Sequence, residues 1–256
     1  MAAGPSVLVL EKAVKLLDCF TPERTHLSVG DLHRLTGLPV TTVARLINTL
    51  VALELLHKTG DTYKVGLRVL TWTAAATAAS DLLEAADRAA AHLRDQTGET
   101  AGMYIPRGTT RVAVVVKLSH QSIIFRGYVG QLMPMRAGAA GKVFLAYDRH
   151  LLSAVLVEMN EGAGIEVPPE LEAQLALTRE QGWILTEQER EKGLNSLAAP
   201  VFDSTGAVVG ALGIGGPSFR LNAQSAREFG PLVAETAASL SSRSGDGPKR
   251  SVGNSA

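Results

Sequence analysis

The chain has little of what several classes of protein require. It contains a single cysteine, Cys19, so no disulfide can form within the chain, which suits a reducing cytoplasm. Its six histidines are scattered without the spacing of a metal site, and no metal or cofactor is expected. No uninterrupted apolar run is long enough to cross a membrane, and the N-terminus lacks the pattern of a signal peptide. We therefore expect a cytoplasmic protein with no membrane partner.

An excess of charge of either sign is also missing. The chain has 25 basic and 25 acidic residues, a formal net charge of +0 and a pI of about 7.0. This balance argues against a protein whose whole surface contacts phosphates, and any DNA contact is expected to be a confined basic patch. A length of 256 residues with 46% hydrophobic and 20% charged residues predicts two globular domains.

Acidic residues are absent from the stretch Leu32–Leu53. The stretch reads as two short helices separated by Gly37-Leu38-Pro39, and in the second helix apolar residues recur at helical spacing. The other face offers short hydrogen-bonding side chains and a guanidinium, which suit a helix-turn-helix reader of DNA. A three-helix interaction module would show the same periodicity and stays open. The predicted core residues are Val43, Leu46, Ile47 and Leu50, and the candidate DNA-binding residues are Arg34, Val40, Thr41, Thr42, Arg45 and Asn48.

A basic hairpin follows directly. Leu55–Lys58 and Thr62–Val65 are short strand-like runs joined by a turn at Thr59-Gly60-Asp61. Lys58 and Lys64 on its arms would neutralise phosphates, as the wing of a winged helix-turn-helix does. A hairpin that merely closes the helical core would explain the fold without the lysines, so DNA binding is favoured.

Helices are expected on both sides of this module. One ends near Phe20, and another, rich in alanine, spans about 66–80 and is followed by a helix over 81–96. We interpret the alanine-rich helix as a connector that contacts a second subunit, with Trp72 as anchor; a helix lying on its own domain is the alternative. The expected buried stripe of the first helix is Leu10, Ala13, Val14, Leu17 and Phe20.

After Gly98 the apolar period changes from helical to alternating. Strands separated by helices predict an α+β domain with a mixed sheet and helices packed on it. The predicted strands are 100–107, 111–118, 122–129, 183–186, 196–203 and 207–215; the predicted helices lie near 141, at 151–159, 169–181 and 222–242.

Two features of this domain invite a chemical interpretation. Gly138-Ala139-Ala140-Gly141 opens a helix, whose free N–H groups suit a carboxylate, although small residues serve tight packing equally well. The acidic cluster Glu187, Glu189 and Glu191 shares its segment with basic and amide residues. We interpret that segment as a solvated loop and not as an acid–base site, and no enzyme is expected.

Three ordered motifs resemble the isocitrate lyase regulator (IclR) family of bacterial transcription factors. They are GLPVTTVARLINTL at Gly37–Leu50, MPMRAGAAGKVFLA at Met133–Ala146, and the block Gly182–Arg220. The resemblance covers about Val7 to Leu240. It implies a winged helix-turn-helix domain that binds double-stranded operator DNA, a GAF-like domain that binds a small organic acid, and homodimers or homotetramers. Repression is the commoner mode that it implies.

Departures from the family pattern bear on specificity. Val40-Thr41 replace a common Lys-Ser pair, so the operator sequence does not carry over. At four positions that resemble polar ligand contacts of the family, this chain carries smaller or less polar residues. They predict a roomier pocket and a bulkier effector, with an aromatic acid as a candidate. The full set of expected effector-binding residues is Met103, Ile105, Leu132, Ala139, Ala140, Thr186, Ser196, Leu197, Leu212, Gly213 and Gly215.

The expected organisation is therefore a reader domain, a connector and a sensor domain. The boundaries are 1–66 for the winged domain, 67–81 for the linker helix, 82–243 for the effector-binding domain and 244–256 for a disordered tail. The alternative function is a small-molecule sensor whose winged domain binds protein, against which the acid-free helix face weighs.

Overall fold

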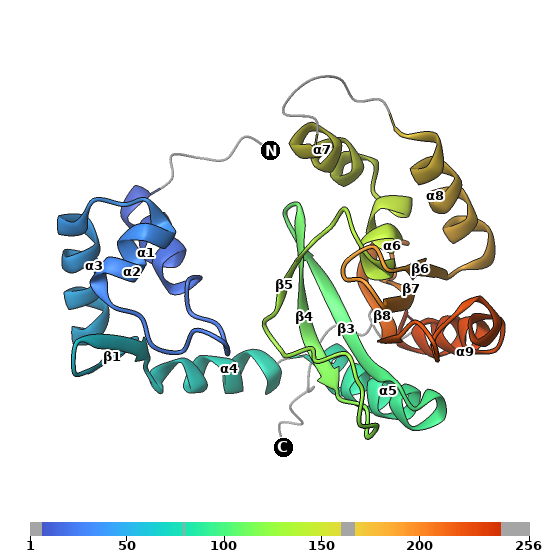
Figure 1. The fold of residues 1–256 in the computed structure, drawn as a ribbon, viewed down its shortest axis with the longest axis horizontal. Coiled ribbons are helices and arrows are strands. Elements are labelled where there is room, and N and C mark those ends of the chain that lie inside the picture. Colours follow the sequence, from blue (N-terminus) through green and yellow to red (C-terminus); the bar gives the residue numbers. More distant parts are fainter. Residues whose placement is uncertain (1–6, 79, 160–166, 242–256) are drawn as a thin grey trace, which may run out of the picture. The chain divides into compact units, whose positions relative to one another are not determined.

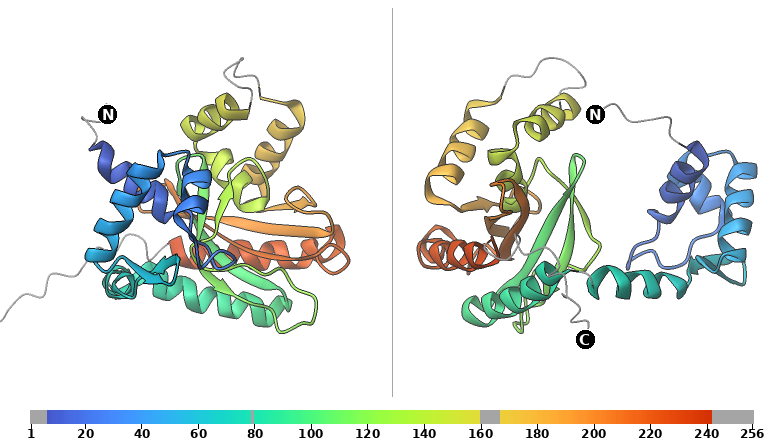
Figure 2. Two further views of the ribbon diagram at one scale, coloured as in Figure 1. Left: turned by 60° about the vertical axis from the view of Figure 1, so that its left-hand side comes forward. Right: turned by 180° about the vertical axis from the view of Figure 1, so that it is seen from behind.

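The computed structural model describes residues 7–78, 80–159 and 167–241 (Figures 1 and 2). The chain divides into two compact units, Met1–Ala79 and Ser80–Ala256. The expected tail, 244–256, lies outside the described residues.

The first unit is a small helical bundle closed by a hairpin. Its elements are α1 (Leu8–Leu17), α2 (Val29–Thr36), α3 (Val40–Ala52), β1 (Leu56–Thr59), β2 (Thr62–Val65) and α4 (Arg68–Ala78). Ser28 and Asp31 form a capping box at the start of α2, and Gly37 ends the helix with a φ of 69°. The helices α2 and α3 meet at a bend of 117° across a three-residue turn. This is the predicted helix-turn-helix, with the hairpin as its wing.

Packing of the first unit agrees with the predicted face of α3. Val43, Leu46, Ile47 and Leu50 are buried against Leu16, Leu32 and Leu56. The prediction for α1 was partly wrong, because Leu10 and Val14 are exposed and Leu16 is the buried residue. A continuous apolar run offers several stripes, and the one that is buried depends on what packs against it.

The second unit is built on a six-stranded sheet in the order β5-β4-β3-β8-β7-β6. The strands are β3 (Thr100–Arg107), β4 (Thr110–Lys117), β5 (Leu132–Pro134), β6 (Ile184–Glu187), β7 (Leu194–Phe202) and β8 (Val208–Pro217). Every pairing is antiparallel, so the α+β class is confirmed but the sheet is not mixed. The predicted strand 122–129 does not form: the segment is irregular, and its Phe125 carbonyl accepts a hydrogen bond from Thr100 Oγ1 at 2.8 Å.

Helices cover both faces of this sheet (Figure 2). On one face α5 (Asp81–Thr97) and α9 (Ala223–Ser241) pack through alanines and leucines against Met103, Leu197 and Leu212. On the other face lie α6 (Ala139–Tyr147), α7 (Arg149–Met159) and α8 (Pro169–Gln181), around a core that includes Met135 and Phe144.

Two glycines of the second unit allow close contacts. A Cβ at Gly230 in α9 would lie 2.3 Å from the indole of Trp183, so the ring packs flat against the helix backbone. A Cβ at Gly216 would lie 2.3 Å from Glu99 Oε2. The buried Glu99 carboxylate accepts two hydrogen bonds from the Arg220 guanidinium, at 2.6 and 2.9 Å, which ties the loop after β8 to the start of β3.

No single helix among the described residues is long and apolar enough to cross a membrane, and only α2 and α3 together, across their bend, reach that length and composition.

Candidate functional site

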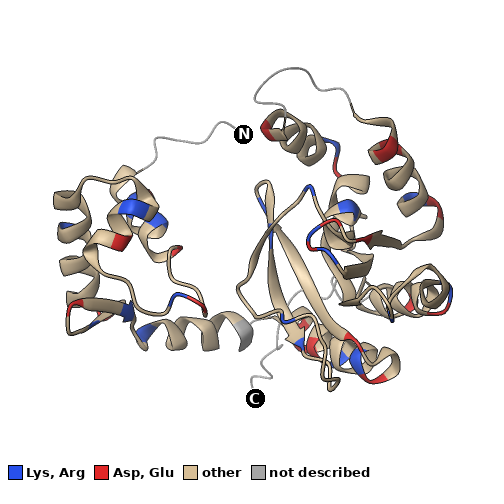
Figure 3. Cartoon of the chain, viewed as in Figure 1, with Lys and Arg blue, Asp and Glu red and all other residues tan. Residues whose placement is uncertain are grey.

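The exposed face of α3 carries the side chains expected to face DNA. Thr41, Arg45 and Asn48 are exposed, Val40 is 50% exposed, and Thr42 is half-buried. The helix has no acidic residue, and its ribbon in Figure 3 carries no acidic colour. A face of short hydrogen-bonding side chains with one guanidinium can approach phosphates and base edges without electrostatic repulsion.

Arg34 is less available than the sequence suggested. Its guanidinium forms an ion pair with Asp31, one helical turn earlier on α2. The same carboxylate accepts hydrogen bonds from the Ser28 hydroxyl at 2.7 Å and the Ser28 N–H at 3.0 Å. Hydrogen bonds from Ser28 hold the pKa of the Asp31 carboxyl below its ordinary value, and Arg34 adds to this. The acid-free stretch begins one residue after Asp31, so the pattern of that stretch does not contain this partner of Arg34.

The wing places its two lysines on opposite faces. In the register of β1 and β2, Lys58 lies opposite Tyr63, and His57 lies opposite Lys64. Directly opposed residues share a face and neighbours alternate, so Lys58 shares its face with Tyr63 and Lys64 shares the other with His57. Both lysines are exposed.

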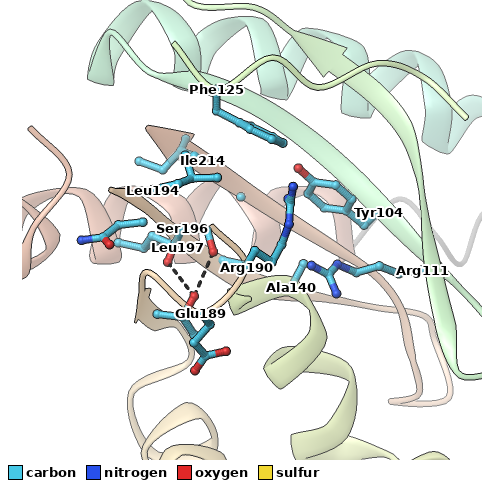
Figure 4. Close-up of a pocket in the computed structure, with 15 residues that line it drawn as sticks. Tyr104, Arg111, Phe125, Ala140, Glu189, Arg190, Leu194, Ser196, Leu197 and Ile214 are labelled. Carbon is cyan, nitrogen blue, oxygen red and sulfur yellow. Dashed lines mark hydrogen bonds between the residues drawn. The ribbon is translucent and has the colours of Figure 1, made fainter. Parts of the chain in front are cut away.

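A cavity in the second unit lies between α6, the paired strands β7 and β8, and the irregular segment that carries Phe125 (Figure 4). Six of the eleven predicted effector-binding residues line it: Ala140, Thr186, Ser196, Leu197, Gly213 and Gly215. Residues that the sequence reasoning missed complete the lining: Tyr104, Arg111, Phe125, Glu189, Arg190, Leu194, Asn195, Ala198 and Ile214.

The other five predicted residues lie elsewhere. Met103 and Leu212 pair across β3 and β8, are fully buried, and face α5 and α9 together with Ile105. Leu212 packs into the core against these helices, so its side chain does not reach the cavity, whereas its neighbour Gly213 lines it. Leu132 on β5 is 42% exposed, and Ala139, the first residue of α6, is buried in the core. These positions do not line the cavity.

The glycines do not make the cavity roomier. A Cβ at Gly215 would lie 3.1 Å from the Phe125 ring, so this ring occupies the space above the glycine. A Cβ at Gly213 would lie 2.4 Å from the Leu197 carbonyl oxygen, which indicates close strand packing. The space within the cavity is about 20 Å³, close to that of one water molecule. The predicted roomier pocket is therefore absent from this structure.

Two hydroxyls organise the start of α6. Ser196 Oγ accepts a hydrogen bond from the Ala139 N–H at 3.1 Å and lies 2.9 Å from Thr186 Oγ1. This joins the predicted residues Ala139, Thr186 and Ser196 in one network, in which Ala139 contributes its backbone. Both hydroxyls belong to residues that line the cavity, so they could donate hydrogen bonds to an oxygen atom of a ligand there.

Glu189 is an anchored residue, and its assignment to a solvated loop was wrong. One of its carboxylate oxygens accepts hydrogen bonds from the Gly138 N–H and from Lys142 Nζ, both at 2.8 Å. The other accepts a hydrogen bond from Gln174 Nε2 at 3.1 Å. The Lys142 side chain is 6% exposed, so the pair is largely shielded from water. An internal carboxylate thus already occupies the N-terminus of α6, where the sequence analysis placed a ligand.

Arg111 brings a positive charge to the cavity wall. It is 2% exposed, its Nη1 donates to the Pro134 carbonyl, and its Nε is buried without a hydrogen-bond partner. Burial lowers the pKa of its guanidinium to about 10. Its Cζ lies 5.9 Å from the centre of the Tyr104 ring, and burial raises the pKa of the Tyr104 hydroxyl.

Arg190 crosses the cavity (Figure 4). Its guanidinium lies 4.9 Å from the centre of the Phe125 ring, a cation–π contact, and its Nη1 lies 3.1 Å from Met133 Sδ. Outside it is an open groove of about 420 Å³ that shares Phe125, Arg190 and Leu194 with the cavity. Arg190, together with Phe125 and Leu194, therefore lies at the boundary between the cavity and the groove.

Family models match both units. Residues 9–60 match the IclR helix-turn-helix domain, and residues 74–242 match the C-terminal domain of the bacterial transcriptional regulator IclR. The chain belongs to the IclR family of DNA-binding transcriptional regulators, which is not a family of enzymes. This confirms the resemblance, the fold class and the absence of an enzymatic role.

The chain is also similar to a named regulator and to solved structures of the same family. The transcriptional repressor AllR of Escherichia coli is 28% identical over 243 residues, covering 92% of this chain and 90% of its own. An IclR regulator from a Silicibacter species is 26% identical with a TM-score of 0.79, covering 94% of this chain and 98% of its own. An IclR homologue from Microbacterium hydrocarbonoxydans, solved in complex with 4-hydroxybenzoate, is 21% identical with a TM-score of 0.76, covering 92% of this chain and 98% of its own.

Proposed function

We propose that this chain is a cytoplasmic repressor whose affinity for double-stranded operator DNA is controlled by a small organic acid bound in the second unit. The observation that carries the proposal is the exposed, acid-free face of α3 beside a lysine-bearing hairpin, in a chain of a DNA-binding family. The relatives named as repressors support repression over activation.

The residues proposed to meet DNA follow from the exposed surface of the first unit. Thr41, Thr42, Arg45 and Asn48 enter the major groove beside Val40, and Arg34 flanks it with its charge partly offset by Asp31. Lys58 and Lys64 hold the phosphate backbone from the two faces of the hairpin.

The proposed effector is an acid because cations outnumber anions at the cavity. Arg111, Arg190 and Lys142 lie in or beside it, and Glu189 is the one acid that lines its described wall. An aromatic ring is the expected body of the ligand because Tyr104 and Phe125 supply the apolar walls. The 4-hydroxybenzoate complex of the Microbacterium homologue supports the same class.

Control of DNA binding follows from linkage between the two sites. Paired first units can adopt more than one arrangement, and the acid binds one arrangement more tightly than another. It shifts the population toward that arrangement by the difference in affinity.

Exposed apolar side chains on α1 and α4 support a homo-oligomer, dimer or tetramer: Leu8, Val9, Leu10, Leu70 and Trp72. Trp72→Arg is expected to lower the molar mass measured by light scattering; an unchanged mass would argue against α4 as a contact.

The first experiment is a gel-shift titration with the DNA upstream of the chain's own gene, with and without a panel of aromatic and aliphatic acids. A salt-sensitive, sequence-selective shift that one acid alters supports both parts of the proposal. Selective binding without any response to acids would contradict the effector part alone. Absence of a selective shift at low salt would favour the second candidate, a sensor whose winged unit binds protein.

A further inference from the structure

Arg111 is a buried cation without a carboxylate to balance it. Among the described residues Arg111 forms no ion pair, and its Nη1 donates a hydrogen bond to the neutral Pro134 carbonyl. Glu189, the one acid that lines the described wall of the cavity, is already bound by Lys142, Gly138 and Gln174. A buried guanidinium with an unpaired Nε is costly, so an anion from outside the chain would satisfy it.

Arg190 occupies the space beside Arg111 that a ligand ring would need. Its flat guanidinium lies 4.9 Å from the Phe125 ring centre, which shows that this ring face accepts a flat group. The free space of about 20 Å³ is far below the roughly 150 Å³ of a cavity that holds benzene. A ring can therefore enter only if the Arg190 side chain leaves.

A route for that movement is present. The outer groove of about 420 Å³ lies on the other side of Arg190 and is lined by Ile123, Arg126, Gln131 and Lys192. The loop is held on both sides of Arg190. The Glu189 carboxylate is bound to α6, the Gln188 N–H donates to the Leu194 carbonyl at 3.0 Å, and Gln188 Oε1 accepts a hydrogen bond from the Gly193 N–H at 2.8 Å. The side chain can thus swing into the groove while its loop stays in place.

We propose that Arg111 is the residue that binds the carboxylate of the effector, and that Arg190 is a displaceable plug on the ring-binding face of Phe125. This rests on the proposed function, and it names a flat aromatic monocarboxylate as the class of ligand. The ring takes the position of the Arg190 guanidinium between Phe125 and Ala140, and the carboxylate meets Arg111 beside the Ser196 and Thr186 hydroxyls.

The test measures binding of benzoate and of its neutral analogue benzamide to the full chain by calorimetry. Arg111→Met should weaken benzoate binding roughly ten- to hundred-fold, as expected for a lost charged hydrogen bond, and remove the preference for benzoate over benzamide. Arg190→Ala should tighten benzoate binding about three- to ten-fold, because no cation–π contact must be broken. Arg149→Ala, a change of equal charge on the exposed start of α7, should leave the affinity unchanged.

The folded state of the variants provides an independent readout. Removing an unbalanced buried charge should raise the melting temperature of Arg111→Met without ligand by a few degrees, while ligand binding is lost. Arg111→Lys, which keeps the charge but not the fork geometry, should retain part of the preference for benzoate.

Each contrary result points to a different failure. Benzoate affinity of Arg111→Met equal to that of the wild type would overturn the role of Arg111. A loss of affinity in Arg190→Ala would overturn the plug and make Arg190 a ligand contact. If the wild type binds no aromatic acid at millimolar concentration yet binds operator DNA, the inference and the effector class fail, and the DNA-binding part of the proposed function stands.

Discussion

Arg45 is the only basic side chain on α3, and it lies on the exposed face. Arg45→Ala should weaken operator binding by about 1–3 kcal/mol and reduce the preference for operator over scrambled DNA, because a guanidinium can read a base edge. Fluorescence anisotropy with both DNAs measures this. Arg34→Ala is the matched comparison and should cost less, since Asp31 already pairs with that guanidinium. Operator affinity equal to the wild type would refute the placement of Arg45 in the groove.

The capping box of α2 makes a prediction about pH. Hydrogen bonds from Ser28 hold the pKa of Asp31 below its ordinary value of 3.8. The carboxylate therefore contributes to stability in full above that value, and the contribution is lost as the pH falls through the lower folded-state pKa. An NMR titration of the Asp31 carboxyl should show this low midpoint, and Asp31→Asn should remove the corresponding pH dependence of melting. A midpoint at or above 3.8 would contradict the capping geometry.

Single residues were the hardest part to predict from sequence. The apolar face of α3 was readable because four residues repeat at helical spacing. The burial of Arg111 could not be predicted, because both alternating sets of residues in β4 contain apolar side chains. The set that is buried consists of Arg111, Ala113 and Val115. The polar partners of Arg34 and Glu189 depend on contacts that no local pattern encodes.

The wing is the element whose register carries a quantitative prediction. Because Lys58 and Lys64 lie on opposite faces, they should meet phosphates of different backbones. Lys58→Ala and Lys64→Ala should each reduce the slope of log affinity against log salt by about 0.9, and the double variant by about 1.8. Anisotropy titrations over a range of salt concentrations measure the slopes. If the double variant lost no more than either single variant, the two lysines would share one phosphate.

Elements with strong local signals were predicted well, and those set by tertiary contacts were not. The helix break at Gly37, the change of pattern after Gly98 and the turn at Gly60 marked true boundaries. The segment 122–129 has the β-branched and aromatic residues of a strand, yet its Phe125 ring fills the space above Gly215 and its backbone leaves the sheet. Packing overrode propensity there, and it also placed the lining residue that the sequence analysis missed.

At the scale of the whole molecule, the division into two compact units predicts separable activities. Residues 80–256 produced alone should bind benzoate with an affinity within about twofold of the full chain, since every residue lining the cavity belongs to that unit. Residues 1–79 alone should retain weak DNA binding and no response to the acid. Calorimetry and anisotropy on the two pieces measure this, and loss of benzoate binding in the longer piece would show that the cavity needs the first unit.

The chain contains only two tryptophans, and they fall one in each unit. Trp72 is 53% exposed on α4, and Trp183 packs its indole against the backbone of α9 at Gly230. Each unit therefore carries its own intrinsic fluorophore: Trp72 is solvent-exposed, and Trp183 lies in a largely apolar environment. Replacing either by phenylalanine leaves a single emitter, so the melting of the first unit and of the second unit can be recorded separately in one unlabelled chain.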